Sequence, residues 1–175
     1  AMGRLLIAAL AALLQGGCVG VPENVTPVTG FELQRYRGKW YEIARLDHSF
    51  ERGLERVSAT YSLREDGGVR VINRGYSTQK REWQQAEGKA YFVDDQRQGY
   101  LKVSFFGPFY GAYVIFKLDS EDYRYAFVAG PNKSYLWLLS RTPTVSDALL
   151  EDFVATPASL GFDTGSLILV PQENG

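Results

Sequence analysis

The sequence predicts an all-β protein: an eight-stranded antiparallel up-and-down barrel, followed by a C-terminal helix and a short final strand. Strand-like runs recur from Trp40 onward at intervals of about 8 to 12 residues, with turn-forming residues between them. The connections are too short for crossover helices, so neighbouring strands must pair antiparallel. A Trp near the start of the first run and Arg141 at the end of the last suggest a sheet that closes on itself.

The expected strands share β-branched and aromatic residues, which favour extended backbone. They are Trp40–Leu46, Glu55–Arg64, Val69–Tyr76, Trp83–Val93, Tyr100–Phe106, Ala112–Leu118, Tyr123–Ala129 and Ser134–Arg141. Gly, Pro, Asn and Asp mark the joints. Eight closed strands leave an interior wide enough for one small ligand, and closure removes the free edge strands.

The segment after the strands carries a helix signal. Ser146, or Thr144 one turn earlier, is an expected N-cap for a helix that continues through 148–153. Pro157 is expected to end or kink this helix, because proline lacks the N–H that the helix needs. The final short strand is expected at 166–170.

The N-terminus has the pattern of a lipoprotein signal peptide over residues 1–17. A basic residue precedes a short apolar run, and small residues lead to Cys18. The run is too short to span a ~30 Å bilayer core. Cys18 is the expected lipidation site; a plain secretory signal and an inert thiol are the alternatives. Residues 18–30 are expected to form a tether, and 31–172 the barrel domain.

Composition narrows the function classes. The chain has 19 basic and 20 acidic side chains, and this balance argues against nucleic acid as a partner. One Cys excludes an intramolecular disulfide and a Cys-rich metal site, and the lone His48 lies beside Asp47 and Ser49. Neither a metal nor another cofactor is expected.

Three motifs in order resemble those of the lipocalin family. Gly38-Lys39-Trp40-Tyr41 matches the first, Asp122-Tyr123 the second, and Arg141 the third. The resemblance spans about 31–170 and is nearest to the bacterial outer-membrane members of the family, through the stretches 50–55, 83–92 and 103–111.

The resemblance implies that these motif residues build the closed base of the barrel. Trp40 is expected inside the base with Arg141 across it, which a cation–π contact would favour. Gly38, Asp122 and Tyr123 are expected to be structural there. No catalytic role is expected for any of them.

Strand alternation predicts which side chains face inward. The expected ligand-binding residues are Ala44, Ala59, Tyr61, Val69, Val71, Ala90, Leu101, Val103, Phe105, Tyr113, Ile115, Tyr135 and Trp137. A filled core is the alternative; the resemblance favours a true cavity. Glu42 shares the inward face of Trp40, so it is expected either to bond groups near the base or to contact a ligand.

The other end of the barrel is the expected mouth. Phe109 and Tyr110 on a Gly/Pro loop suggest an exposed rim that touches membrane, gates the cavity or forms a homodimer, unless the rings fold onto neighbouring loops. Mouth loops carry Arg52, Lys80 and Arg81, whereas the base loops are acidic. A mildly basic mouth is expected to face anionic headgroups.

The resemblance therefore implies a lipid-anchored protein on the periplasmic face of the outer membrane. It is expected to bind, store or transport fatty acids such as palmitate, or lysophospholipids, for membrane maintenance under stress. The alternatives are a lipid-modifying enzyme on the same scaffold, for which His48 is the candidate residue, and a transmembrane barrel with outward-facing apolar residues.

Overall fold

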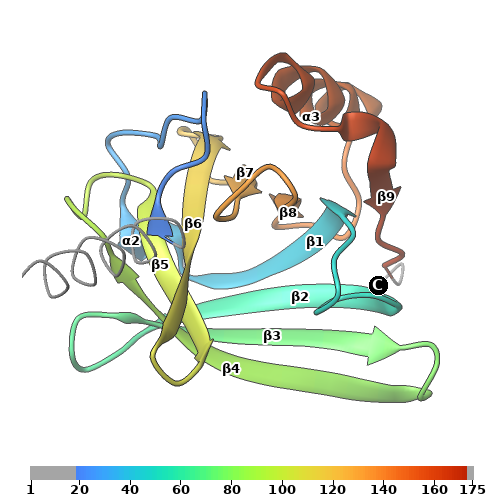
Figure 1. Ribbon diagram of the computed structural model, residues 1–175, viewed down its shortest axis with the longest axis horizontal. Helices are drawn as coiled ribbons and strands as arrows, with labels where there is room; N and C mark the ends of the chain where they lie inside the picture. The colour runs from blue at the N-terminus through green and yellow to red at the C-terminus, as the bar shows by residue number, and fades with distance from the viewer. Residues whose placement is uncertain (1–18, 173–175) are drawn as a thin grey trace, which may run out of the picture.

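The computed structural model describes residues 19–172, and its eight long strands form a closed antiparallel barrel (Figure 1). Strand β1 pairs with β2 on one edge and with β8 on the other, which closes the sheet. The strands are β1 (Gly38–Leu46), β2 (Leu54–Leu63), β3 (Val69–Ser77), β4 (Glu82–Phe92), β5 (Tyr100–Phe106), β6 (Phe109–Leu118), β7 (Tyr125–Ala129) and β8 (Leu136–Ser140). The predicted fold class is confirmed.

Six strands begin one to three residues away from the predicted start, and β6 and β7 are two of them. β6 starts at Phe109 rather than Ala112, so the connection from β5 is only the two-residue turn Gly107-Pro108. β7 starts at Tyr125 because Tyr123 has a φ of 51°, which does not fit an extended strand.

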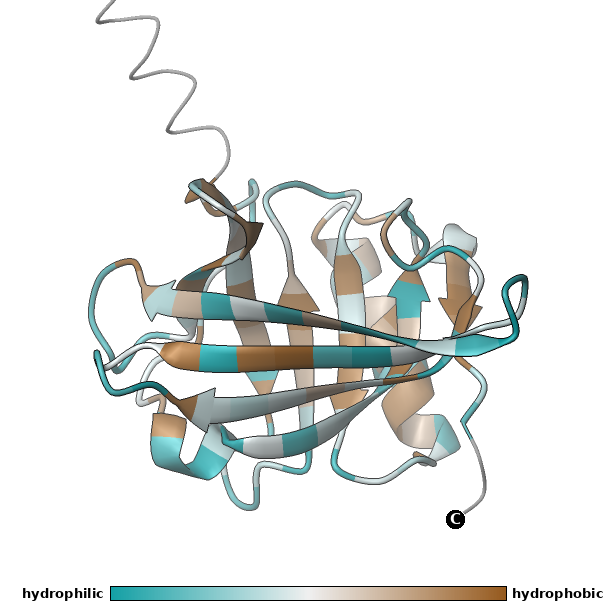
Figure 2. Cartoon of the chain, turned by 90° about the horizontal axis from the view of Figure 1, so that it is seen from below, coloured by the Kyte–Doolittle hydropathy of each residue, from teal (hydrophilic) through white to brown (hydrophobic). Residues whose placement is uncertain are grey.

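Apolar side chains fill two layers, one inside the barrel and one outside it. Hydrophobic and hydrophilic residues alternate along the strands, as the period of two requires (Figure 2). The inner cluster surrounds Trp40. The outer cluster lies between the sheet and helix α3 (Asp147–Ser159), where Phe153 packs edge-on against Phe127 at a centroid distance of 5.0 Å.

Helix α3 starts as expected and ends later than expected. The Ser146 hydroxyl accepts a hydrogen bond from the Leu149 N–H, which confirms this N-cap. Pro157 lies buried inside the helix, which continues to Ser159. The prediction that Pro157 ends the helix was therefore wrong. The chain turns at Gly161, whose φ of 96° suits glycine.

A β-bulge in β1 reverses the direction of its side chains. Glu42 pairs with Leu139 but Ala44 pairs with Leu138, so Ile43 is an extra residue on this strand. One extra residue shifts the inward face by one position. Beyond the bulge, Arg45 lies opposite Trp137 and points inward.

The C-terminal segment closes a seam between β1 and β2. These two strands pair only from Gly38 to Tyr41, and nearer the mouth their backbones separate. There strand β9 (Leu167–Leu169) pairs with β1 instead of β2. The Gln172 side-chain amide then donates to the backbone oxygens of both Glu42 (2.7 Å) and Val57 (3.0 Å). The Gln172 side chain thus supplies hydrogen-bond donors to backbone oxygens that β1 and β2 do not satisfy by pairing with each other.

The expected tether is packed against the barrel where the structure describes it. Val25 is buried, and the Val28 backbone bonds to Ile115 and Gly99 on either side. The chain then enters the short helix α2 (Leu33–Tyr36) at the closed end of the barrel. Within 19–30 a buried valine and backbone hydrogen bonds therefore hold the segment against the barrel, and its role as a tether stays a prediction. Cys18 and the signal segment lie outside the described residues.

Candidate ligand-binding site

A cavity of about 590 Å³ occupies the barrel interior and is lined mainly by apolar and aromatic side chains. Most of the predicted inward-facing residues line it: Ala59, Tyr61, Val69, Val71, Ala90, Leu101, Val103, Phe105, Tyr113, Tyr135 and Trp137. The volume lies within the range of about 300–1,000 Å³ that is usual for small-molecule sites. The interior is a cavity rather than a filled core.

Two predicted lining residues do not reach the cavity. Ala44 packs in the outer cluster, because the bulge before it turns its side chain outward. Ile115 does point into the barrel, where it is fully buried in the inner cluster, but it is absent from the cavity wall. The prediction therefore placed Ala44 on the wrong face of the sheet. It placed Ile115 on the correct inner face, but Ile115 is packed in the core and does not line the cavity.

A chain of three tyrosines crosses the cavity floor. The Tyr113 hydroxyl lies 2.6 Å from that of Tyr36 and 2.7 Å from that of Tyr61. Burial raises the pKa of all three phenols above the ordinary value, so they stay neutral and share hydrogen bonds. The floor is thereby polar but uncharged.

The base below this floor is built from the first and third motifs. The Arg141 guanidinium lies 3.9 Å from the centroid of the Trp40 ring, and Trp40 is fully buried. Arg141 also donates to the backbone oxygens of Lys39, Arg35 and Tyr123. Gly38 has a φ of 96°, and a Cβ there would lie 3.4 Å from an Arg141 nitrogen. The residues thus seal the closed end.

The second motif contributes through Tyr123 alone. Its hydroxyl accepts a hydrogen bond from the Glu32 N–H (3.0 Å), which fixes the entry into helix α2. Asp122 is exposed and its carboxylate lies 3.7 Å from Arg124, away from the base cluster of Trp40 and Arg141. The carboxylate that orders this turn is Asp119, which accepts from the Arg124 N–H.

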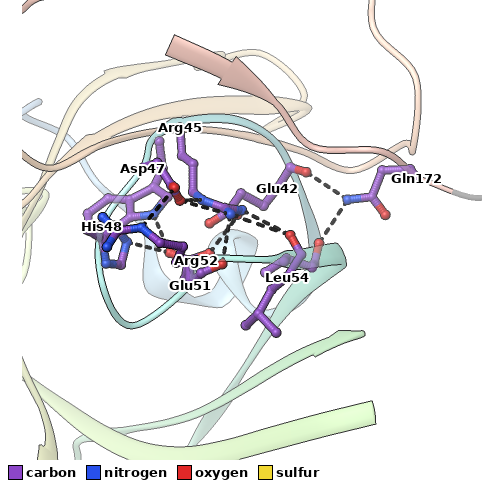
Figure 3. A network of polar contacts seen from close by, with 10 residues as sticks. Glu42, Arg45, Asp47, His48, Glu51, Arg52, Leu54 and Gln172 are labelled. Atoms are coloured by element: carbon purple, nitrogen blue, oxygen red, sulfur yellow. Dashed lines mark hydrogen bonds and ion pairs between the residues drawn. The ribbon is translucent and has the colours of Figure 1, made fainter. Parts of the chain in front are cut away.

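A polar cluster forms one wall of the cavity beside the mouth (Figure 3). The Arg45 guanidinium donates to Glu42 at 3.0 Å, and both side chains are almost completely buried. One Glu51 carboxylate oxygen accepts from Trp137 Nε1 and lies 2.8 Å from His48 Nε2. The expected partner of Glu42 near the base was wrong: its partner is Arg45, which the bulge turns inward.

The pKa values of the two glutamates in this wall move in opposite directions. Burial, together with the neighbouring Glu51 charge, raises the pKa of Glu42 well above its ordinary value. Burial also acts on Glu51, but hydrogen bonds from His48, Glu42 and Trp137 outweigh it and lower the pKa of Glu51 to about 2. The two buried carboxyl groups of this wall therefore differ in how readily they ionise, Glu51 losing its proton at lower pH than Glu42.

The mouth has an exposed aromatic rim. Phe50, Phe106 and Phe109 are 69%, 67% and 77% exposed, and the Phe50 and Phe106 rings lie 6.5 Å apart. Tyr110 is different, because its half-buried ring packs against Lys102 and Tyr91 on the outer face. The predicted rim is found at Phe109, whereas Tyr110 follows the alternative in which the ring folds onto its neighbours.

The basic residues of the mouth differ in how they are held. Arg52 lies 3.5 Å from Asp47, and Lys133 donates to the backbone oxygen of Leu160. Lys80 and Arg81 are exposed in the turn between β3 and β4. Free positive charge at the mouth is therefore concentrated in this one turn.

Several residues of the site could not be predicted from the sequence. Arg45 was missed because nothing in the strand pattern marks the bulge. Glu51 and Phe50 belong to a loop whose course depends on Arg45, which binds the backbone oxygens of Glu51 and Leu54. Tyr36 could have been found from its position four residues before Trp40. Its backbone oxygen accepts a hydrogen bond from the Trp40 indole N–H.

Within residues 19–172, no group of three or more His, Cys, Asp and Glu side chains is placed to hold a metal ion. Within the same range, no helix has the length and apolar character needed to cross a membrane.

Comparisons with known proteins agree with this architecture. Residues 31–172 match the family described as "Lipocalin-like domain". The chain is 61% identical to "Outer membrane lipoprotein Blc" of Vibrio cholerae, over 97% of this chain and 99% of that protein. It is 54% identical to the protein of the same name in Escherichia coli, with 96% of each covered. Mouse apolipoprotein D is 28% identical, over 82% of this chain and 78% of that protein.

Solved structures show the same fold at lower identity. Insecticyanin from the tobacco hornworm Manduca sexta superposes with a TM-score of 0.70 at 20% identity, covering 89% of this chain and 88% of that one. A lobster apocrustacyanin A1 gives 0.64 at 19% identity, with 88% and 94% covered.

Proposed function

Because the chain belongs to the lipocalin family, we propose that its cavity binds a single-chain lipid, either a fatty acid such as palmitate or a lysophospholipid. Lipocalins are generally binding and transport proteins rather than enzymes. The observation that carries the proposal is the apolar cavity, enclosed at the base and open at the mouth. Binding, storage or transport of such lipids would serve membrane maintenance under stress.

Energetics favour a long acyl chain as the guest. Each buried CH₂ contributes about 0.8 kcal/mol, so a chain of ~14 to 16 carbons contributes on the order of 10 kcal/mol before costs. Ordering the chain and losing free motion remove several kcal/mol of this gain. The remainder corresponds to affinity in the micromolar range. Two chains would strain a barrel of eight strands, so one-chain lipids fit better.

The lipid head is proposed to lie near the polar wall and the mouth. The floor offers only neutral phenols, and the apolar walls above it suit a hydrocarbon tail. Glu42, His48 and Glu51 line the cavity at this wall, and Arg45 binds Glu42 and the Glu51 backbone. A head there keeps its contact with water, whereas burial at the floor would remove it.

The site of action is proposed to be the outer membrane. The relatives at 54–61% identity are named outer membrane lipoproteins, and this sequence has Cys18 at the end of a signal-like segment. Lipidation of Cys18 would anchor the barrel on the periplasmic face.

The exposed Phe50, Phe106 and Phe109 are proposed to form a homodimer contact, which sedimentation at several protein concentrations would detect.

Native mass spectrometry of protein purified without added lipid tests the main proposal. A bound mass equal to a fatty acid or lysophospholipid is expected, and it should leave when the protein is denatured. A spectrum that shows only the bare chain, together with no uptake of added palmitate or lysophospholipid, would contradict lipid binding. Turnover of ester substrates that is lost in His48→Ala would instead favour the enzyme.

A further inference from the structure

The chain leaves the described part of the structure beside one outer face of the barrel. Val19 is the first described residue, and its backbone oxygen accepts a hydrogen bond from the Tyr100 hydroxyl. From there the segment stays against the barrel, with Val25 buried and Val28 bonded to Ile115. Position 18 is one peptide unit, about 3.8 Å, further along. A lipid at Cys18 would therefore hold the barrel by this face, with no long tether between them.

This face carries three tyrosines and two lysines on neighbouring strands. Strands β4, β5 and β6 lie side by side (Figure 1), and Tyr91 of β4 is paired with Lys102 of β5. Lys102 Nζ lies 4.9 Å from the centroid of the Tyr110 ring, and the Tyr91 and Tyr110 rings are 6.4 Å apart. We call Lys89, Tyr91, Tyr100, Lys102 and Tyr110 the tyrosine–lysine face; all five side chains are half-buried.

The two lysines leave this face with uncompensated positive charge. Of the nearby carboxylates, Asp66 pairs with Arg64 and accepts from Tyr91, while Glu87 pairs with Arg70 at 2.6 Å. Throughout residues 19–172, no carboxylate lies within 4.0 Å of either lysine in an ion pair. Lysines without a carboxylate partner attract anionic lipid headgroups, and tyrosine rings favour the boundary between headgroups and water.

We propose that the tyrosine–lysine face is the surface by which the barrel lies on its own membrane, with anionic lipid headgroups as its occupant. The inference rests on the lipid anchoring that the proposed function includes. The strands would then run along the bilayer surface, so the mouth opens sideways rather than into the membrane. A lipid guest would enter from the water layer beside the bilayer. This orientation differs from a basic mouth turned toward the headgroups.

The six lysines of the chain allow a test without any substitution. The full lipidated chain is placed in phosphatidylethanolamine vesicles with and without phosphatidylglycerol, and amines are acetylated briefly and mapped by mass spectrometry. Lys89 and Lys102 should react about fivefold more slowly on the vesicles with phosphatidylglycerol than in detergent. Lys80, at the mouth, and Lys39, at the base, should react at unchanged rates. Slower reaction of Lys80 with no change at Lys102 would overturn the proposal.

A charge-reversal variant tests the cause of the contact. In Lys89→Glu/Lys102→Glu, nitration of Tyr110 on anionic vesicles should be as fast as in detergent, whereas the matched control Lys80→Glu should keep the slow reaction of the wild type. Equal slowing in all three proteins would contradict the role of the lysines. If the double variant does not fold, the acetylation map of the unaltered chain still decides the orientation.

Flotation separates this inference from the function on which it rests. A chain that does not float with vesicles contradicts anchoring itself. A chain that floats but leaves Lys89 and Lys102 fully reactive contradicts only the tyrosine–lysine face.

Discussion

Arg45 binds Glu42 across the bulge of β1 at 3.0 Å, with both side chains almost fully removed from water. The bulge makes this pair possible, since residues three apart on a regular strand point to opposite faces. The pair anchors the loop that carries Glu51, because Arg45 also donates to the Glu51 backbone oxygen at 2.8 Å. Cavity wall and mouth loop therefore form one unit.

Glu42→Gln should stabilise the protein at neutral pH. The raised pKa of Glu42 means that its contribution to stability is present at low pH and is lost as pH rises toward the folded-state pKa. Glutamine keeps an oxygen for Arg45 without a proton to lose. Urea unfolding at several pH values measures this, and the gain should vanish below about pH 4. A variant less stable than wild type at neutral pH would contradict the raised pKa of Glu42 as a source of instability.

Glu51→Gln should have the opposite effect. The pKa of Glu51 is lowered to about 2, so ionised Glu51 stabilises the fold above its ordinary value of 4.5, and this contribution is lost as pH falls toward 2. The variant should be less stable at neutral pH and less sensitive to acid. Glu55→Gln, which removes another carboxylate near the mouth, serves as the control in the same unfolding series. Parallel acid profiles for Glu51→Gln and wild type would contradict the prediction.

Arg141→Lys should destabilise the base by about 2–3 kcal/mol, since an ammonium cannot cover the Trp40 ring and bind three backbone oxygens together. Thermal unfolding measures the change. The control is Arg124→Lys, an exposed arginine paired with Asp119, for which the expected loss is within about 0.5 kcal/mol. Equal losses for the two variants would argue against a special role of Arg141.

Gln172→Glu should open the seam between β1 and β2. The carboxylate has no donor for the Glu42 and Val57 oxygens, so two backbone acceptors lose their partner, at a cost of about 1–3 kcal/mol. Glu42 and Val57 both line the cavity. A bound fluorescent fatty acid should therefore also dissociate faster from the variant in stopped-flow measurements. Gln96→Glu, in an exposed loop, is the matched control. Unchanged release and stability would show that the tail is not needed for closure.

Ala86→Trp should block lipid binding without unfolding the barrel. Ala86 lines the cavity with its side chain exposed to the open space, so an indole has room there and occupies the volume of the guest. Fatty-acid titration should show at least a tenfold loss of affinity, about 1.4 kcal/mol. Ser62→Trp, on an exposed outward position of β2, should bind normally. Normal binding by both variants would place the ligand outside the cavity.

The lipocalin motifs determined the base of the barrel at the level of single residues. Trp40, Arg141 and Gly38 meet where the first and last strands close, as predicted. These contacts could be predicted because the three motifs resemble those of the lipocalin family, which implies this arrangement at the closed end. Most of the cavity wall followed from the same alternation.

The sequence by itself determined the fold class, the strand order and the apolar interior, because local alternation and short connections specify them. Only the tertiary structure decided the bulge at Ile43, the inward turn of Arg45, the packing of 19–30 and the closure by Gln172. The packing of 19–30 and the closure by Gln172 depend on partners distant in sequence, and Arg45 depends on partners that the bulge brings within its reach. No local pattern records such a requirement, since a bulge forms only where its partners across the barrel make it favourable.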